Sequence, residues 1–243
     1  MPALAIVTGG AYEEGLSTAE AVLHAGLRVS IWDDNEVRLQ AAKRELPDAD
    51  VRCVDVADLD DVKRAYAAVK SELGDVEALY NMATLKNTFM IGEHESRSKE
   101  TIPFWKLDTG KLTRAVNVNV LGTFYCSTVV TPDMVAAGRG LIVNFSTGVH
   151  TQRSVDHVPY GPTKALVDAF SVIAAEQLKP HGVRVNVLIS GGAVNRRGSY
   201  DPKRQPFDWM APIVRYLASD ASKDVTGRIF TGGEDPVAHN PTK

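Results

Sequence analysis

Two residues with complementary acid–base chemistry, Tyr160 and Lys164, lie four positions apart at the start of an apolar, helix-like run. A four-residue spacing on a helix places two side chains on the same face. A tyrosine phenol has an ordinary pKa of about 10, and a nearby ammonium group favours its ionised form. We therefore expect Lys164 to lower the pKa of Tyr160 and to prepare it as a general acid or base. Such pairs are common in helices, so the context decides between this role and a structural one.

A hydroxyl group precedes this pair at the end of a strand-like segment. The side chain of Thr147 can donate a hydrogen bond to a substrate oxygen, while its methyl group narrows the surrounding space. Ser146 offers a second hydroxyl, but neighbouring side chains on a strand point to opposite faces. The sequence therefore favours Thr147 as the residue that orients a substrate.

The size and composition of the chain exclude several classes of protein. The 243 residues carry a net charge of −3, contain no basic block and are 44% apolar, which is typical of an ordinary globular protein and not of a nucleic-acid-binding one. No apolar run reaches the ~20 residues of a membrane span, and the amino terminus lacks the pattern of a signal peptide. Two cysteines, Cys53 and Cys126, form no metal or redox motif. We expect a cytoplasmic protein without a membrane, nucleic-acid or metal partner.

Short apolar segments alternate with longer amphipathic ones along the chain. This alternation predicts one α/β domain over residues 1–243, with a doubly wound parallel sheet of the Rossmann type covered by helices on both faces. The expected strands are residues 3–8, 28–32, 51–55, 76–82, 140–146, 183–189 and 228–231. The expected helices are residues 16–25, 37–46, 59–73, 112–137, 160–179 and 209–218.

A glycine-bearing turn joins the first expected strand to the first helix. Gly9 and Gly15 would let the backbone approach a pyrophosphate at the positive end of that helix. Asp33 follows the second strand, where a carboxylate suits a ribose diol and repels a 2′-phosphate, so NAD(H) is favoured over NADP(H). Arg38 is a potential partner for a 2′-phosphate, but it lies well into the next expected helix. The alternative for Asp33 is a solvated turn.

Two polar segments interrupt the alternation at positions that follow strands. Residues 84–110 and 195–207 should lie at the carboxyl edge of the sheet, where ligands bind in this class of fold, and we expect both to be substrate-side loops. Four arginines belong to segments expected around the substrate. An anionic substrate would suit them, because guanidinium groups capture carboxylates and phosphates. These arginines are Arg153, Arg196, Arg197 and Arg204.

Taken together, these motifs resemble those of the short-chain dehydrogenase/reductase family over most of the chain. The family's Thr-Gly-x-x-x-Gly-x-Gly turn matches Thr8, Gly9 and Gly15. Its later landmarks match Asp55-Val56, Asn81-Met82-Ala83-Thr84, Asn119 in Asn119-Val120-Leu121-Gly122, the catalytic hydroxyl at Thr147, Tyr160-x-x-x-Lys164, Arg184-Val185-Asn186-Val187 and Val225-Thr226-Gly227.

The resemblance implies a seven-stranded sheet in the order 3-2-1-4-5-6-7 and NAD(H)-dependent interconversion of a secondary alcohol and a ketone. Tyr160 would move the proton, Thr147 would hold the substrate oxygen, Lys164 would hold the nicotinamide ribose, and Asn119 would hold a water. The implied cofactor-binding residues are Gly9, Tyr12, Gly15, Asp33, Asp55, Val56, Asn81, Ala83, Tyr160, Lys164 and Gly191. A homotetramer or homodimer built on the two longest helices is also implied.

The sequence departs from the family pattern mainly in the phosphate turn. Glu13 replaces its middle glycine and Glu14 follows, so two carboxylates stand where a pyrophosphate is expected. Two alternatives therefore stay open. One is a non-catalytic binding or regulatory protein with an impaired cofactor turn. The other is a lyase, isomerase or dehalogenase without net hydride transfer. For Asn119, a buried amide that bridges backbone groups is the structural alternative.

Overall fold

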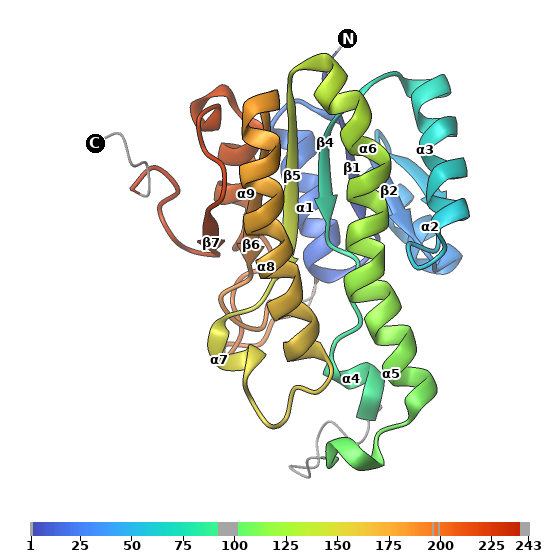
Figure 1. Cartoon of the computed structure of the whole chain (residues 1–243), viewed down its shortest axis with the longest axis vertical. Helices are drawn as coiled ribbons and strands as arrows, with labels where there is room; N and C mark the ends of the chain where they lie inside the picture. The colour runs from blue at the N-terminus through green and yellow to red at the C-terminus, as the bar shows by residue number, and fades with distance from the viewer. Residues whose placement is uncertain (1, 92–101, 196, 199, 239–243) are drawn as a thin grey trace.

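Seven parallel strands form one sheet in the order β3-β2-β1-β4-β5-β6-β7 in the computed structural model, which describes residues 2–91, 102–195, 197–198 and 200–238 (Figure 1). This confirms the expected fold class and strand order. The strands are β1 (Leu4–Thr8), β2 (Arg28–Asp33), β3 (Asp50–Cys53), β4 (Val76–Asn81), β5 (Gly140–Ser146), β6 (Val183–Ile189) and β7 (Ile229–Thr231). From β1 the chain runs outward through β2 and β3, and it then returns to β4 on the other side of β1. Sheets of this kind bind ligands at such a reversal of strand order, beside the carboxyl ends of the strands.

Helices cover both faces of this sheet, as continuous apolar strands require. One face carries α1 (Glu13–His24), α2 (Glu36–Glu45) and α9 (Ala211–Ala218), and the other carries α3 (Leu59–Leu73), α6 (Thr123–Ala137) and α8 (Tyr160–Leu178) (Figure 1). Side chains pointing alternately from the strands build two separate cores. Val7 and Ile31 belong to the core under α1, and Leu4 and Ile6 to the core under α6.

The shorter elements lie in the connections. They are α4 (Asn87–Ile91), α5 (Thr109–Val116) and α7 (Val149–Gln152), with 3₁₀ turns at Phe104–Lys106, Lys179–His181 and Asp220–Ser222. The expected loop 84–110 therefore contains α4 and the beginning of α5, while residues 92–101 lie outside the described part of the chain. In the expected loop 195–207, Arg196 and Ser199 also lie outside it.

Helix boundaries differ from the predictions in two places that matter for the site. Helix α1 begins at Glu13, three residues before the expected start, so both glutamates belong to its first turn. The helix expected over residues 112–137 begins at Thr109 and contains a π-helical segment, Asn117–Gly122, between α5 and α6. Local apolar spacing could not locate either feature, because the first depends on a glutamate in a left-handed conformation and the second on a backbone hydrogen-bond pattern that apolar spacing does not report.

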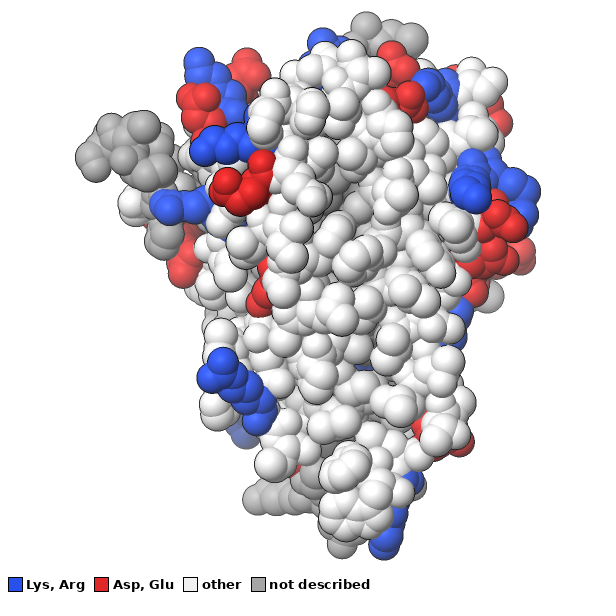
Figure 2. All heavy atoms as spheres, viewed as in Figure 1, with Lys and Arg blue, Asp and Glu red and all other residues white. Residues whose placement is uncertain are grey.

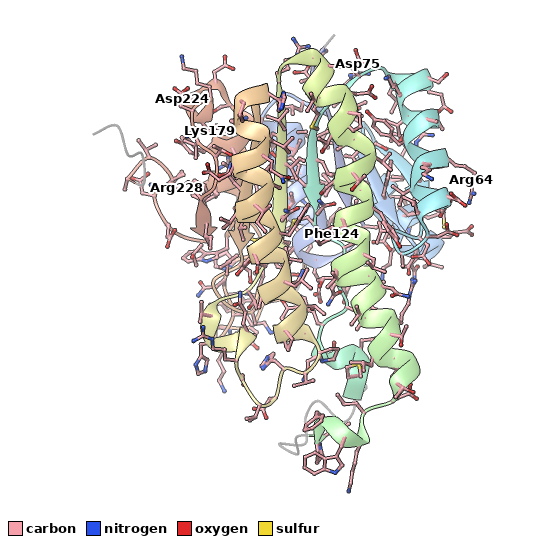
Figure 3. All side chains as sticks on the ribbon, viewed as in Figure 1. Arg64, Asp75, Phe124, Lys179, Asp224 and Arg228 are labelled. Atoms are coloured by element: carbon pink, nitrogen blue, oxygen red, sulfur yellow. The ribbon has the colours of Figure 1, made fainter. Side chains whose placement is uncertain are left out.

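The continuous helical segment Thr109–Ala137 corrects one expectation about membranes. It is long and apolar enough to cross a membrane by length and composition alone. In this structure its α6 part packs along β4 and β5 and beside α3. Phe124 of α6 turns toward α8 (Figure 3), where its ring stacks on Phe170 with a centroid separation of 4.0 Å.

Candidate active site and dinucleotide cavity

A cavity opens at the carboxyl ends of β1, β2 and β4, where the sequence predicts the cofactor. Its lining comes mainly from the turn after β1, the ends of β2 and β3, and the segment after β4, with further residues from α2, α5, the π-helical segment and β5. The lining residues include Gly9, Tyr12, Gly15, Asp33, Asp55, Val56 and Ala83 from the predicted cofactor set. The topology thus brings together seven of the residues that sequence reasoning singled out.

The turn after β1 is packed too tightly for side chains at its glycines. A Cβ on Gly15 would stand 1.9 Å from the carbonyl oxygen of Gly9, and a Cβ on Gly9 would stand 2.6 Å from the Cα of Ala83. Gly9 also has a φ of 60°, which favours glycine. The glycines therefore let the turn, helix α1 and the end of β4 meet with backbone in contact.

The end of the cavity beside β2 and β3 has the polarity expected for an adenosine. Asp33 is buried at the end of β2 and accepts a hydrogen bond from the Asn35 amide at 3.1 Å. Burial, the largest influence, raises its pKa. Nearby, Arg114 of α5 donates to Asp55 at 2.7 and 3.0 Å and to Asp34 at 3.1 Å. Desolvation opposes ionisation of Asp55, but the hydrogen bonds from Arg114 and from the Ala57 amide, with the charge of Arg114, together outweigh it, and the pKa of Asp55 is lowered.

Arg38 is nearer to this cavity than the sequence suggested. Its guanidinium group stacks over the ring of Tyr12 at 4.4 Å from the centroid, and both residues line the cavity. The expectation that Arg38 lies too far along its helix is wrong, because the first turn of α2 faces back over the glycine turn. A cation therefore stands near Asp33 at the end of the cavity where a 2′-phosphate would lie.

The middle of the cavity holds an ion-pair cluster of Glu13, Glu14 and Lys86. The ammonium group of Lys86 lies 2.9 Å from Glu13 Oε2 and 2.8 and 2.9 Å from the two oxygens of Glu14. Glu13 has a φ of 46°, the left-handed region that a glycine adopts without strain. The residues at the adenosine end fit a dinucleotide, whereas these two carboxylates line the part of the cavity beside the glycine turn, where the sequence predicts the pyrophosphate, and do not suit an anion.

The predicted proton-transfer residues come together beside this cluster, at the start of α8. Thr147 lies close enough to Tyr160 for its hydroxyl to lower the pKa of that phenol, and the ammonium group of Lys164 lies 5.9 Å from the centroid of the Tyr160 ring. Lys164 is almost fully buried and donates to the carbonyl oxygen of Phe145 at 2.8 Å. The Ser146 hydroxyl donates to the Lys164 carbonyl at 3.4 Å, so Ser146 faces the helix that carries Tyr160, and the expectation that strand alternation sends it to the other side of the sheet is wrong.

The pKa values of these groups correct the simplest form of the sequence argument. Burial raises the pKa of Tyr160 to about 12, and Lys86, with the Thr147 hydrogen bond, opposes that increase. Burial also lowers the pKa of Lys164 to about 7. The expectation that Lys164 depresses the pKa of Tyr160 is therefore wrong for this arrangement, because desolvation dominates both groups. The nearby cation that favours the phenolate is Lys86.

Asn119 adopts the structural arrangement that the sequence left open. Its side chain is fully buried in the π-helical segment. Its amide oxygen accepts from the Leu85 amide at 2.7 Å and its amide nitrogen donates to the Leu85 carbonyl at 3.1 Å and to Thr163 at 3.1 Å. Asn119 thus ties the segment after β4, which carries Lys86, to the first turn of α8, which carries Tyr160.

Two predicted cofactor contacts differ from their expected positions. The Asn81 side chain is buried between β4 and α6, where it donates to Ser127 at 3.1 Å and to Asn144 at 2.9 Å. Gly191 packs near Trp209, whose indole nitrogen would lie 3.6 Å from an added Cβ. Neither residue lines the cavity described above. Both lie where parallel strands end, but sequence spacing does not reveal which way a side chain or turn faces.

The arginines expected around an anionic substrate are largely engaged elsewhere. Arg197 pairs with Glu20 and, at 2.8 Å, with Glu45, which joins its segment to α1 and α2. Arg204 donates to the carbonyl oxygen of Val194 at 3.3 Å. Arg153 is exposed, and Arg196 lies outside the described residues. The guanidinium groups of Arg197 and Arg204 therefore hold a surface segment and do not converge on Tyr160.

Sequence reasoning missed Lys86, Arg114 and Asp168 as site residues. Lys86 and Arg114 come from polar stretches that look like ordinary solvated surface, and their partners are distant in sequence. Asp168 lies one helical turn beyond Lys164, and its charge opposes the lowering of the Lys164 pKa. The four-residue spacing of Asp168 from Lys164 was the one signal available for it. Among the described residues, no group of acidic, histidine or cysteine side chains could hold a metal ion.

Comparisons with known proteins agree with this architecture. The chain matches the model of the family described as short chain dehydrogenase over residues 3–197. D-erythrulose reductase of Gallus gallus is 31% identical over 240 residues, which covers 92% of this chain and 91% of the relative. The 2-dehydro-3-deoxy-L-rhamnonate dehydrogenase (NAD(+)) of Sphingomonas sp. (strain SKA58) is 30% identical over 184 residues, or 76% of this chain and 69% of the relative.

Solved structures show the same fold. A short-chain type dehydrogenase/reductase from Mycobacterium ulcerans superposes with a TM-score of 0.79 at 25% identity, covering 95% of this chain and 89% of that one. An NAD+-bound xylitol dehydrogenase superposes with a TM-score of 0.80 at 22% identity, covering 95% and 98%.

Proposed function

Because the chain belongs to the short-chain dehydrogenase family, we propose that it is an oxidoreductase that interconverts a small polyhydroxylated alcohol and its ketone, with NAD(H) as the preferred nicotinamide cofactor. One observation carries this proposal: Tyr160 and buried Lys164 come together at the start of α8, with Thr147 close enough to lower the pKa of Tyr160, beside a cavity that Asp33 lines at its far end. The relatives named for erythrulose and for a rhamnonate derivative support a hydroxylated substrate.

The roles of the protein's own groups follow from their positions. A bound nicotinamide would supply or accept the hydride. The Tyr160 hydroxyl would donate its proton to the substrate oxygen in reduction and accept one in oxidation, and Thr147 would hold that oxygen by a second hydrogen bond. With its pKa raised to about 12, the phenol of Tyr160 is protonated near neutral pH, which is the form required at the start of reduction. We therefore propose that the protein works as a reductase.

Residues at the adenosine end would hold the cofactor. Asp33 would accept hydrogen bonds from the ribose hydroxyls, and Val56 would pack against the base. Asp33 and Asp34 disfavour a 2′-phosphate, whereas Arg38 favours one. We propose NAD(H), because Asp33 stands at the strand end itself and Arg38 is already stacked on Tyr12.

A direct experiment tests this function. Purified protein is mixed with NADH and either erythrulose or xylulose, and the loss of NADH absorbance is followed with and without the ketone. The expected result is ketone-dependent oxidation of NADH that is faster than with NADPH. Conversion of the ketone without consumption of either cofactor would instead identify an isomerase or lyase.

The ion-pair cluster favours a second candidate function, that of a non-catalytic binding protein. Glu13 and Glu14 lie in the turn where a pyrophosphate is expected, and Lys86 forms ion pairs with both, which leaves the cluster with a net charge of −1. If this arrangement excludes dinucleotides permanently, NADH fluorescence will not change even at millimolar cofactor. The retained hydroxyls of Thr147 and Tyr160 favour the enzyme.

We also propose a homo-oligomer assembled through α6 and α8. Figure 2 shows a broad face over these two helices that is almost free of charged side chains, with Lys, Arg, Asp and Glu gathered at its borders. Leu166, Val172 and Ile173 of α8 are exposed. Burial of such side chains in a second copy would remove apolar surface from water. Light scattering of the wild type and of Ile173→Lys tests this, and a wild-type monomer would contradict it.

A further inference from the structure

Helix α1 presents its own anions at the end that would bind a phosphate. The amino terminus of a helix carries a partial positive charge and free amide groups, which attract anions. In this chain, Glu13 and Glu14 belong to that first turn. Glu14 is only 8% exposed, so its carboxylate is held inside the cavity and not in solvent.

Lys86 holds both carboxylates from the opposite wall of the cavity. Its ammonium group contacts three carboxylate oxygens at 2.8–2.9 Å. Burial disfavours the charge on Lys86, but the two glutamates more than offset this effect, and the pKa of Lys86 is raised. The segment of Lys86 is itself anchored, because Asn119 binds both backbone groups of the adjacent Leu85. The lysine is therefore a positioned cation.

The two carboxylates resemble the pyrophosphate of a dinucleotide in charge. The pair of carboxylates and the pyrophosphate each carry two negative charges over neighbouring oxygens. Either group suits the same helix end and the same lysine. The glycines that permit close backbone approach, Gly9 and Gly15, lie in the same turn as the glutamates. Lys86 and the amino terminus of α1 cannot contact the two carboxylates and a pyrophosphate at the same time, because these anionic groups would repel one another at short range.

We propose that Glu13 and Glu14 form an internal competitor for the pyrophosphate, and that Lys86 is the cation for which the carboxylates and the cofactor compete. Cofactor binding then requires the carboxylates to leave Lys86. This inference rests on the proposed function and adds to it a built-in limit on dinucleotide affinity. Adenosine has no phosphates and would contact only the Asp33 end of the cavity. Its affinity should therefore not depend on the carboxylates.

Four variants change the charge of the cluster in steps. Glu14→Gln and Glu13→Gln each remove one negative charge, the double variant removes both, and Lys86→Met removes the positive charge. Glutamine keeps the size of each side chain and the backbone strain at position 13. Glu36→Gln is the matched control, because Glu36 is an acidic first-turn residue of α2 outside the cavity. Circular dichroism and thermal unfolding verify that each variant is folded.

NADH is titrated into each protein by fluorescence, and adenosine by calorimetry. We expect NADH to bind about tenfold more tightly to Glu14→Gln, more tightly still to the double variant, and at least about tenfold more weakly to Lys86→Met. Adenosine affinity should stay the same throughout. Equal NADH affinity in the wild type and the double variant would overturn the competitor while leaving the proposed function intact. Failure of NADH to bind any of the variants would overturn both.

Discussion

The two ends of the cleft differ in how they depart from the family pattern. At the proton-transfer end, Thr147 replaces a serine but supplies the same hydroxyl, which lies close enough to Tyr160 to lower its pKa. At the phosphate turn, Glu13 replaces a glycine with a charged side chain at a φ of 46°, and Lys86, far away in the sequence, compensates for the charge. A substitution that keeps the functional group needs no partner, whereas one that adds a charge changes the surroundings as well.

The largest effect is expected at the proton-transfer end. Tyr160→Phe removes the proton donor and should lower the rate of ketone reduction by about 10²–10⁴-fold. NADH affinity should change less than about twofold, since the lost hydroxyl lies at the other end of the cleft. Steady-state rates and a fluorescence titration measure the two quantities. Tyr200→Phe, at an exposed residue, is the control. A Tyr160→Phe variant with normal turnover would refute the assignment.

The next effect is expected in the phosphate turn. Gly15→Ala places a methyl group 1.9 Å from the Gly9 carbonyl oxygen, so the turn must move. We expect the free energy of unfolding to fall by about 1–3 kcal/mol and NADH binding to weaken. Gly148→Ala is the control, because a Cβ there meets no atom within 4 Å. Equal denaturant midpoints for the two variants would show that the turn is not closely packed.

The pH dependence of stability tests the burial of Lys164. Its pKa falls from 10.5 to about 7 in the folded protein. Between these values the unfolded chain binds more protons at this residue, so its contribution to stability increases with pH. The stability of the wild type relative to Lys164→Met should therefore rise by more than about 1 kcal/mol between about pH 6.5 and about pH 9. Urea unfolding at both pH values measures this difference, and a constant difference would contradict it.

A smaller effect concerns the choice of cofactor at the adenosine end. Asp33→Ser removes the carboxylate that opposes a 2′-phosphate and leaves Arg38 beside Tyr12. The ratio of NADPH to NADH affinity should rise about tenfold, the order expected for one partly screened charge. Parallel fluorescence titrations measure the ratio, with exposed Asp48→Asn as the control. An unchanged ratio would place the 2′ position away from Asp33.

The smallest effect is expected for Arg197. Its ion pairs with Glu20 and Glu45 are partly exposed, so Arg197→Gln should cost at most about 1 kcal/mol of stability. The variant should also leave the relative turnover of a carboxylic acid substrate and its methyl ester unchanged. A selective loss of turnover of the acid would support an anionic substrate and would show that this segment contributes to the active site.

Much of the fold could be predicted because its signals are local. Apolar strands between amphipathic helices predicted the parallel sheet and its helical layers, and Asp58, the cap that starts α3, is adjacent to the expected boundary. The start of α1 was missed because a glutamate rarely adopts a left-handed conformation. Spacing likewise predicted which residues approach the cavity, but it placed Asn81 and Arg38 wrongly, because side-chain direction depends on neighbours from other elements.

The amino-acid sequence by itself determined the order of the elements, the glycine turn and the helical face shared by Tyr160 and Lys164, since these depend on short-range spacing and backbone sterics. Only the tertiary structure decided the electrostatics. Burial moves the pKa values of both residues, and Lys86 meets Glu13 and Glu14 across more than seventy residues of chain. Desolvation and charge pairing depend on distances in space, which spacing along the chain does not specify.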